Sequence, residues 1–493
     1  MSFRYFLTTT ALCLTAAGPG FALTAEEVWE NWQSTATASG QTMTAGSTNK
    51  SGDTLTITDL TVSAMMPDGT VETNVSEVTM TESGGAVEIL SSPSYVIRMQ
   101  FTDIDGTEGA VNMSLTHQGL VTTATGSPGA INYDFTADKL TFALGEIEAP
   151  DVPEQFDMSF VIDNMAGNYT TGAGTQVDTD FTADELTVNL EFSDPNDGSA
   201  TVTGGMVDLV SSSSGTLSPF TGGQNLLPML REGLSSEGEV TFGQGGYTVE
   251  GSGPDGDFVI ETSSSSGNFT YALTEGGLRY GGGNTDVSVN FIAPGQFIPP
   301  VQFQIARSNG EVEMPMIATS DARPFGIDLD IEGLQVSDTL WSMIDPTGGL
   351  PRDPADIALD IDGMGNWDVE LLDPEAMAAA ETSGEMPGKV QSVDLSRLLL
   401  RVAGAELTGT GAFTFNNSTV PPVPAGKVNL ELMGGNGLLD KLVAIGIVPE
   451  EQAMGARMML GLFARPGNGP DSLVSEIEVK EDGSILANGQ RIQ

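Results

Sequence analysis

The feature that most constrains the fold is a segment with alternating apolar residues that occurs twice in the chain. YDFTADKLTFAL covers residues 133–144, and TDFTADELTVNL covers residues 179–190. Alternation of apolar and polar residues is typical of a β-strand with one apolar face. The apolar positions of the first copy are Phe135, Ala137, Leu140, Phe142 and Leu144. Packing and turn residues account for the whole repeated segment, so it requires no chemistry.

The parity of the apolar positions changes once within each copy, at Asp138 and at Asp184. One extra residue in a strand exchanges its two faces, so the change predicts a bulge or a tight Asx turn at each aspartate. The segment SGDTLTITDLTVSAM shows the same change at Asp59. The unit is therefore a strand, a kink and a second strand with one apolar side.

Related strand units recur along the chain. IDNMAGNYTTG (162–172) and IDGMGNWDVEL (361–371) both place an aromatic residue after Gly-Asn, and SGNFTYAL (266–273) is a looser relative. Gly-Asn is a turn dipeptide that allows positive φ. We predict a mainly β protein, built as a long, curved antiparallel sheet with kinked strands. The repeats are too irregular for a propeller or a β-helix.

A few short helices are expected at the N-terminus and near the C-terminus. The first contains a capping box of Thr24 and Glu27, with Val28 and Trp32 on one side. Four more are predicted over 337–345, over 373–381, over roughly 437–445, and from Pro449 onward. The chain should close with strands joined at the turns Asp482-Gly483 and Asn488-Gly489.

Residues 1–22 have the pattern of a signal peptide. Arg4 is followed by an apolar run and by small residues that end at Ala22, where we predict cleavage. Processing would remove Cys13, the only cysteine, and leave no thiol, disulfide or cysteine-ligated metal. We therefore expect a periplasmic, exported protein with no membrane span after cleavage.

The formal net charge is −49, with 67 acidic residues against 18 Lys and Arg. Nucleic acid is excluded as a partner because binding it requires clustered cations, and docking on an anionic membrane is disfavoured. Solubility explains the acidity. Calcium is the alternative, and the nearest candidates are the segments 194–199 and 253–258. Neither has the closing Glu of a twelve-residue calcium loop, so ordinary Asp-Gly turns are expected there.

Catalytic patterns are weak. His117 is the only histidine, and it falls in phase with a strand that ends at Gln118-Gly119. A Ser–His–Asp triad would have to use it, but the chain has no GxSxG elbow. STNK (47–50) has the spacing of a serine–lysine dyad without its companion elements. The sequence predicts no catalytic, cofactor or metal residue, and no enzyme.

Domain boundaries are soft. A loop-rich interval is expected over 211–223, and the related β halves 23–230 and 231–493 would meet near it. One continuous elongated domain is the alternative.

Two stretches carry a resemblance to a family. The helix EEVWENWQ with SGDTLTITDLTV, and the tail GLLDKLVAIGIVPEEQ…EIEVKEDGSILANGQRI, resemble the uncharacterised exported bacterial family called domain of unknown function 2125. The resemblance brings no catalytic residue. The closing strands are also similar to those of AsmA-like periplasmic β-proteins, which implies a role in envelope lipid homeostasis.

Together these features predict a periplasmic β-rich binding protein that carries a lipid or another apolar ligand, or that assists envelope maintenance. Two segments rich in Pro, Gly and Met are candidates to line an apolar groove, 295–306 and 458–467. The first alternative is a ligand-free scaffold that binds an envelope protein. The second is a secreted hydrolase that uses His117 and Ser47.

Overall fold

The structure is a computed structural model. It describes residues 22–66, 69–102, 106–148, 155–171, 176–194, 198–216, 226–254, 256–294, 299–383, 386–419 and 421–493. All of the expected signal segment except Ala22 lies outside these residues. So do parts of the two candidate calcium turns, residues 195–197 and Asp255.

The described chain is mainly β, as predicted, and its 26 strands form one antiparallel sheet. The first eleven are β1 (Gln41–Ser51), β2 (Thr54–Met66), β3 (Gly69–Ser83), β4 (Ala86–Ser91), β5 (Ser94–Thr102), β6 (Glu108–Gln118), β7 (Val121–Ser127), β8 (Ala130–Glu148), β9 (Gln155–Thr171), β10 (Gln176–Asp194) and β11 (Gly198–Thr216). The others are β12 (Ser236–Phe242), β13 (Gly245–Ser252), β14 (Phe258–Ser264), β15 (Ser266–Thr274), β16 (Gly277–Ile292), β17 (Val301–Met314), β18 (Arg323–Val336), β19 (Ala355–Trp367), β20 (Gly388–Val402), β21 (Ala405–Asn416), β22 (Val423–Met433), β23 (Arg465–Pro466), β24 (Ser472–Val479), β25 (Ile485–Ala487) and β26 (Gln490–Arg491).

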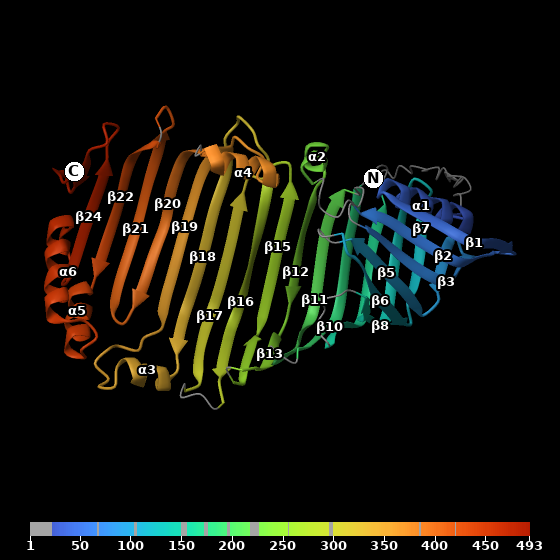
Figure 1. The fold of residues 1–493 in the computed structure, drawn as a ribbon, viewed down its shortest axis with the longest axis horizontal. Helices are drawn as coiled ribbons and strands as arrows, with labels where there is room; N and C mark the ends of the chain where they lie inside the picture. Colours follow the sequence, from blue (N-terminus) through green and yellow to red (C-terminus); the bar gives the residue numbers. More distant parts are fainter. Residues whose placement is uncertain are drawn as a thin grey trace, which may run out of the picture.

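The sheet is a long meander in which most strands pair with the next one along the chain. Where a long strand is interrupted, its two pieces pair with the same neighbour: β4 and β5 with β3, and β12 and β13 with β11. Figure 1 shows the sheet twisting along its length, so that β1–β3 run at a steep angle to β22 and β24. The pairing of β11 with β12 carries the sheet past residue 230 without a break. Residues 211–216, expected in a loop, are strand residues of β11.

The repeated segment lies on β8 and β10, and both strands pair with β9. Leu140 of the first copy and Leu186 of the second both oppose Ile162. Phe142 and Val188 likewise oppose one residue, Phe160, from its two sides. The two copies are thus the flanks of one central strand, and matching apolar residues continue one row across it.

The kinks are real, but their geometry differs from the prediction at Asp138 and Asp184. Register is the same on both sides of Asp138, so neither strand gains a residue relative to the other, and the two paired strands exchange their faces together. The left-handed residue lies opposite, on the partner strand: Asn164, with φ 50°, and Asp208, with φ 55°. Asn and Asp tolerate this conformation better than other side chains with a Cβ. Asn164 also donates a 2.8 Å hydrogen bond to Asp184, which holds the kink across the strand pair.

The Gly-Asn dipeptides are not turns, which corrects a second prediction. Gly167 lies inside β9 and opposes Phe135 and Phe181. A Cβ on Gly167 would lie 2.7 Å from the ring of Phe135 and 2.4 Å from a backbone oxygen of Asp180. Gly267 is similar, since a Cβ there would lie 2.1 Å from the Phe242 ring. Glycine is required because an aromatic ring on the neighbouring strand covers the position.

The five expected helices are present in the described chain, and a sixth, α2, was not predicted. They are α1 (Ala25–Ala38), α2 (Leu226–Arg231), α3 (Asp338–Ile344), α4 (Pro374–Ser383), α5 (Gly435–Ala444) and α6 (Glu450–Phe463). The capping box of Thr24 and Glu27 is formed. Figure 1 shows α2, α3 and α4 at the ends of the strands, and α5 and α6 beside the C-terminal strands. The helix α2 buries Leu230 against Met316 and Ile317.

The main core lies under α1. Val28 and Trp29 pack on apolar residues of β2, β3, β4, β7 and β8, among them Ile57, Met80 and Tyr133, each 0% exposed. One helix therefore covers the apolar face of the sheet at its N-terminal end.

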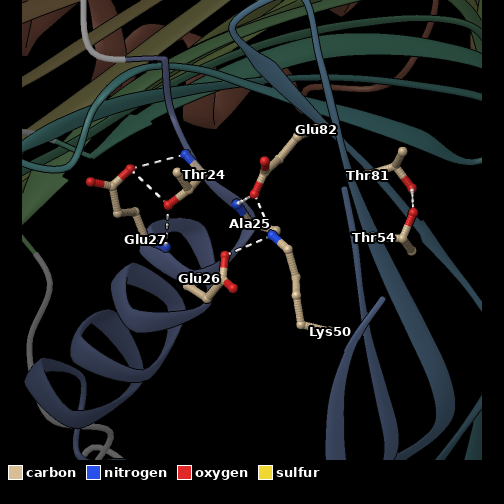
Figure 2. Close-up of polar contacts among 8 residues, drawn as sticks. All are labelled: Thr24, Ala25, Glu26, Glu27, Lys50, Thr54, Thr81 and Glu82. Atoms are coloured by element: carbon tan, nitrogen blue, oxygen red, sulfur yellow. Dashed lines mark hydrogen bonds and ion pairs between the residues drawn. The ribbon is translucent and has the colours of Figure 1, made fainter. Parts of the chain in front are cut away.

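Polar contacts fix the start of α1 to the sheet (Figure 2). Lys50 of β1 pairs with Glu26 of α1 at 2.8 Å and with Glu82 of β3. Glu82 also accepts a 2.9 Å hydrogen bond from the backbone N–H of Ala25. The bond from Lys50, and then the bond from Ala25, hold the pKa of Glu82 below its ordinary value. The lysine thus links the helix to two strands.

Two isoleucines on the same face of the sheet test how much the cover by α1 stabilises the fold. Ile57 is buried under α1, whereas the side chain of Ile327 is 48% exposed. We expect Ile57→Ala to lower the free energy of unfolding by about 2–5 kcal/mol, since it leaves a cavity. Ile327→Ala should cost about 1 kcal/mol or less, because its side chain is only partly buried. Urea unfolding followed by circular dichroism measures both. Equal losses of unfolding free energy in the two variants would contradict the conclusion that α1 covers Ile57 and leaves Ile327 open.

The Lys50 contacts predict an acid dependence. A lowered pKa means that Glu82 stabilises the fold above its ordinary pKa of 4.5, and that this contribution is lost as the pH falls. We expect Lys50→Met to cost about 1 kcal/mol at pH 7. The difference from the wild type should shrink below pH 4.5. Unfolding at pH 7, 5 and 3 measures it, and a difference that is constant with pH would refute the role of these contacts.

Candidate functional site

The same face that α1 covers continues as a row of aligned residues across nine strands, beginning with β8. Directly opposed residues of antiparallel strands point to the same face of a sheet. From β8 to β18 the row is Phe142, Phe160, Val188, Gly204, Tyr247, Thr262, Val289, Phe303 and Val336. None of these side chains carries a charge.

Two more rows extend this face to the C-terminal strands. One runs from β15 to β20 through Tyr271, Tyr280, Val312, Ile327, Ile361 and Leu395. The other runs from β18 to β24 through Ile331, Ile357, Leu400, Leu407, Leu432 and Leu473. We call these three rows the apolar band.

The apolar band is partly open to solvent. Tyr280 is 56% exposed, Tyr247 50%, Ile327 48% and Leu400 39%. Figure 1 shows helices at the ends of the strands and beside the C-terminal strands, and no helix of the described residues crosses the middle of the sheet. A contiguous apolar surface of this kind on a folded chain marks a site of interaction.

A hollow interrupts the band where its residues are small. Gly204 and Gly245 have no side chains, and Met206, Phe242 and Tyr247 stand around them. The cavity holds about 460 Å³, within the usual size range of ligand pockets. Its lining contains no charged residue. The arrangement can take an uncharged, hydrophobic group such as an acyl chain.

The opposite face of the sheet is polar and acidic. In β18, Asp328 and Asp330 alternate with the apolar band residues Ile327 and Ile331. Arg397 pairs with Asp330 at 2.7 Å. Burial, followed by the neighbouring carboxylates, raises the pKa of Asp360 on this face. Charge and apolar surface are therefore separated by the thickness of a single sheet.

Two tyrosines mark the boundary between the covered core and the open band. The rings of Tyr133 and Tyr169 stack with centroids 4.6 Å apart. Tyr133 donates a 2.7 Å hydrogen bond to Asn31 of α1. Burial raises the pKa of Tyr169 to about 12, and burial also raises the pKa of Tyr133.

His117 lies at the end of β6, as expected, and is 8% exposed. Its Nε2 is 2.9 Å from the carbonyl oxygen of Ser92 and 3.3 Å from Ser91 Oγ. A carbonyl only accepts, so Nε2 carries the proton and the lone pair lies on Nδ1. That nitrogen is buried without a hydrogen-bond partner. A triad needs the lone pair directed at the serine, which this geometry does not provide.

Ser47 and Lys50 do not meet. Ser47 Oγ lies 2.8 Å from Thr58 Oγ1, whereas Lys50 is bound to Glu26 and Glu82. Residues three apart in a strand point to opposite faces, which separates the two side chains.

Neither a metal cluster nor a membrane-spanning helix appears in the part of the chain that the structure describes. No group of three or more His, Cys, Asp or Glu residues in it is placed to hold a metal ion. None of its helices is long and apolar enough to cross a bilayer.

Of the two segments expected to line a groove, residues 295–298 lie outside the described chain, and the described parts of both segments contribute to apolar surfaces. Phe303 of the first belongs to the apolar band, and Met459, Leu460 and Phe463 of the second line a groove between α5 and α6. Tyr247, Tyr280 and Ile327 were not anticipated. The alternation in IDLDIEG (327–333) identifies the face of Ile327, but it does not show that the face is open.

Comparison with known proteins gives one family. Residues 299–487 match the model of the family described as "Uncharacterized protein conserved in bacteria (DUF2125)". The matched region runs from β17 to β25 and includes the C-terminal motif on which the resemblance was based as far as residue 487, but not the N-terminal motif. No curated protein and no solved structure matches the chain.

The raised pKa of Tyr169 predicts a loss of stability in alkali. Its neutral form is favoured in the folded state, so its contribution is complete below the ordinary pKa of 10.0 and is lost as the pH rises towards 12. We expect Tyr169→Phe to reduce this loss by about 1.4 kcal/mol per pH unit. Urea unfolding at pH 9, 10 and 11 measures the slope, and equal slopes for variant and wild type would contradict the prediction.

Proposed function

We propose that this protein, whose residues 299–487 belong to the DUF2125 family, binds lipids or other apolar molecules along its apolar band. The observation that carries the proposal is the partly open band, with Ile327 and Tyr280 about half exposed on an uncharged face. Exposed apolar surface costs about 25 cal/mol per Å², which an acyl chain lying on the band would recover. The expected signal segment 1–22 suggests that binding takes place in the periplasm.

The form of the band supports an elongated ligand. Its rows cross the strands one after another, so a chain-like molecule can lie along a row and touch each strand in turn. The hollow at Gly204 and Gly245 adds about 460 Å³ of depth at one point. Aromatic rings of the band offer broad apolar contact, and the ring centroid of Tyr280 lies 4.8 Å from that of the neighbouring Phe269.

The proposal is tested by placing a charge on the band. Ile327→Glu and Tyr247→Glu should each weaken the binding of a fluorescent fatty acid at least tenfold, because the carboxylate would have to lose water against the ligand. Lipid extracted from wild-type protein purified from its native host should be detected by mass spectrometry.

A matched control is available on the opposite face. Val210 is 50% exposed and opposes Thr182 and Thr241 on the polar side. Val210→Glu should bind the fatty acid as the wild type does. If the wild type carries no lipid and takes up no fatty acid, while crosslinking in cells recovers a protein partner, the ligand-free scaffold replaces this proposal.

A further inference from the structure

We propose that the helical hairpin of α5 and α6 docks on a zwitterionic lipid bilayer, with the exposed side of α6 inserted among the lipids. The inference rests on the proposed function in one respect: docking would serve to load the apolar band with lipid. It concerns a different surface, at the C-terminal end of the sheet.

The outer side of α6 is apolar and uncovered. Met454, Met458 and Leu462 follow one another at intervals of four residues, so they form one stripe along the helix. Their exposed fractions are 65%, 72% and 59%. Nothing lies within 4 Å of the Cβ positions of Gly455 and Gly461 beside the stripe. Most of the stripe is therefore in water.

A groove lies between the two helices. It encloses about 420 Å³ and is lined by Gly435, Leu438, Leu439, Leu442, Ala456, Met459, Leu460 and Phe463. No polar or charged side chain contributes to it. Methionine adapts its shape to varied apolar surroundings, which suits contact with mobile acyl chains.

The hairpin is fixed at its base. Asp471 accepts hydrogen bonds from the backbone N–H groups of Asn436 and Gly437, at 3.3 and 2.8 Å, and so holds the start of α5. The carbonyl of Phe463, at the end of α6, accepts bonds from Ser475 and Asn488. Both ends are held by polar contacts, while the outer stripe of α6 stays exposed.

The groove adjoins the apolar band. A Cβ on Gly435 would lie 2.5 Å from the side chain of Leu432, which belongs to the band. Figure 1 shows α5 and α6 next to β22 and β24, where the band ends. An acyl chain that entered the groove from a bilayer would meet the band directly.

Charge favours an uncharged bilayer over other occupants. Residues 435–463 contain three acidic and two basic side chains, whereas the whole chain has a formal charge of −49. Charge of this size repels a second copy of the chain and an anionic surface. Helices that bind anionic lipids carry many Lys and Arg residues on their polar side, and α6 has only Arg457.

Flotation of the full chain with phosphatidylcholine vesicles tests the inference. We expect the wild type to float and the double variant Met458→Glu/Leu462→Glu to float at least tenfold less. Replacing part of the lipid with phosphatidylglycerol should weaken the binding of the wild type. Met65→Glu is the control, because Met65 is 78% exposed in β2 at the other end of the sheet.

The two proposals fail separately. The double variant should still bind fluorescent fatty acid in solution without vesicles, and Ile327→Glu should still float. The docking inference is overturned if the wild type does not float, or if the double variant floats equally well. It is also overturned if the wild type sediments as a dimer and the double variant as a monomer, while both float equally well. Circular dichroism confirms that each variant is folded.

Discussion

Antiparallel pairing makes opposed residues share a face, and every larger feature of this molecule depends on that constraint. It holds here because the register survives the kinks: the pairs on both sides of Asp138 keep the same alignment. A strand that gained a residue alone would turn its apolar positions to the other side of the sheet from that of its neighbours. Because register is preserved, Leu140, Ile162 and Leu186 remain aligned on three strands, and similar rows continue as far as Leu473.

The same face of the sheet is buried at its N-terminal end and partly open further along. At the N-terminal end α1 covers it, and Ile57 is fully buried. Further along, Ile327 occupies the same face and is half exposed. The amino-acid types are alike, so the difference comes from the presence of a helix and from the contacts of Lys50 that hold it. Full burial of such a side chain is worth about 1.5–3 kcal/mol, and the open part of the sheet forgoes much of that stabilisation.

Local patterns predicted the strands, the shared faces and five helices, since these follow from periodicity and capping within short segments. Features that depend on a neighbouring strand were missed. The left-handed residue opposite Asp138 is Asn164, and Gly167 is required by the ring of Phe135 and the Cβ of Phe181. The short α2 was also missed, because six residues give too little periodicity. Alternation shows which residues share a face, but whether Tyr280 and Ile327 are covered depends on where helices distant in the sequence come to lie.

The shared kinks also bear on how such a chain can change in length. The repeated segment recurs after one hairpin, with β9 between its copies, and equivalent residues flank the same central strand. Insertion of another hairpin with this pattern would extend the sheet by two strands and leave all other pairs aligned. Gene duplication could therefore lengthen the sheet in steps of one hairpin. The length of the sheet is then set by the number of hairpins, and no single hairpin has to change.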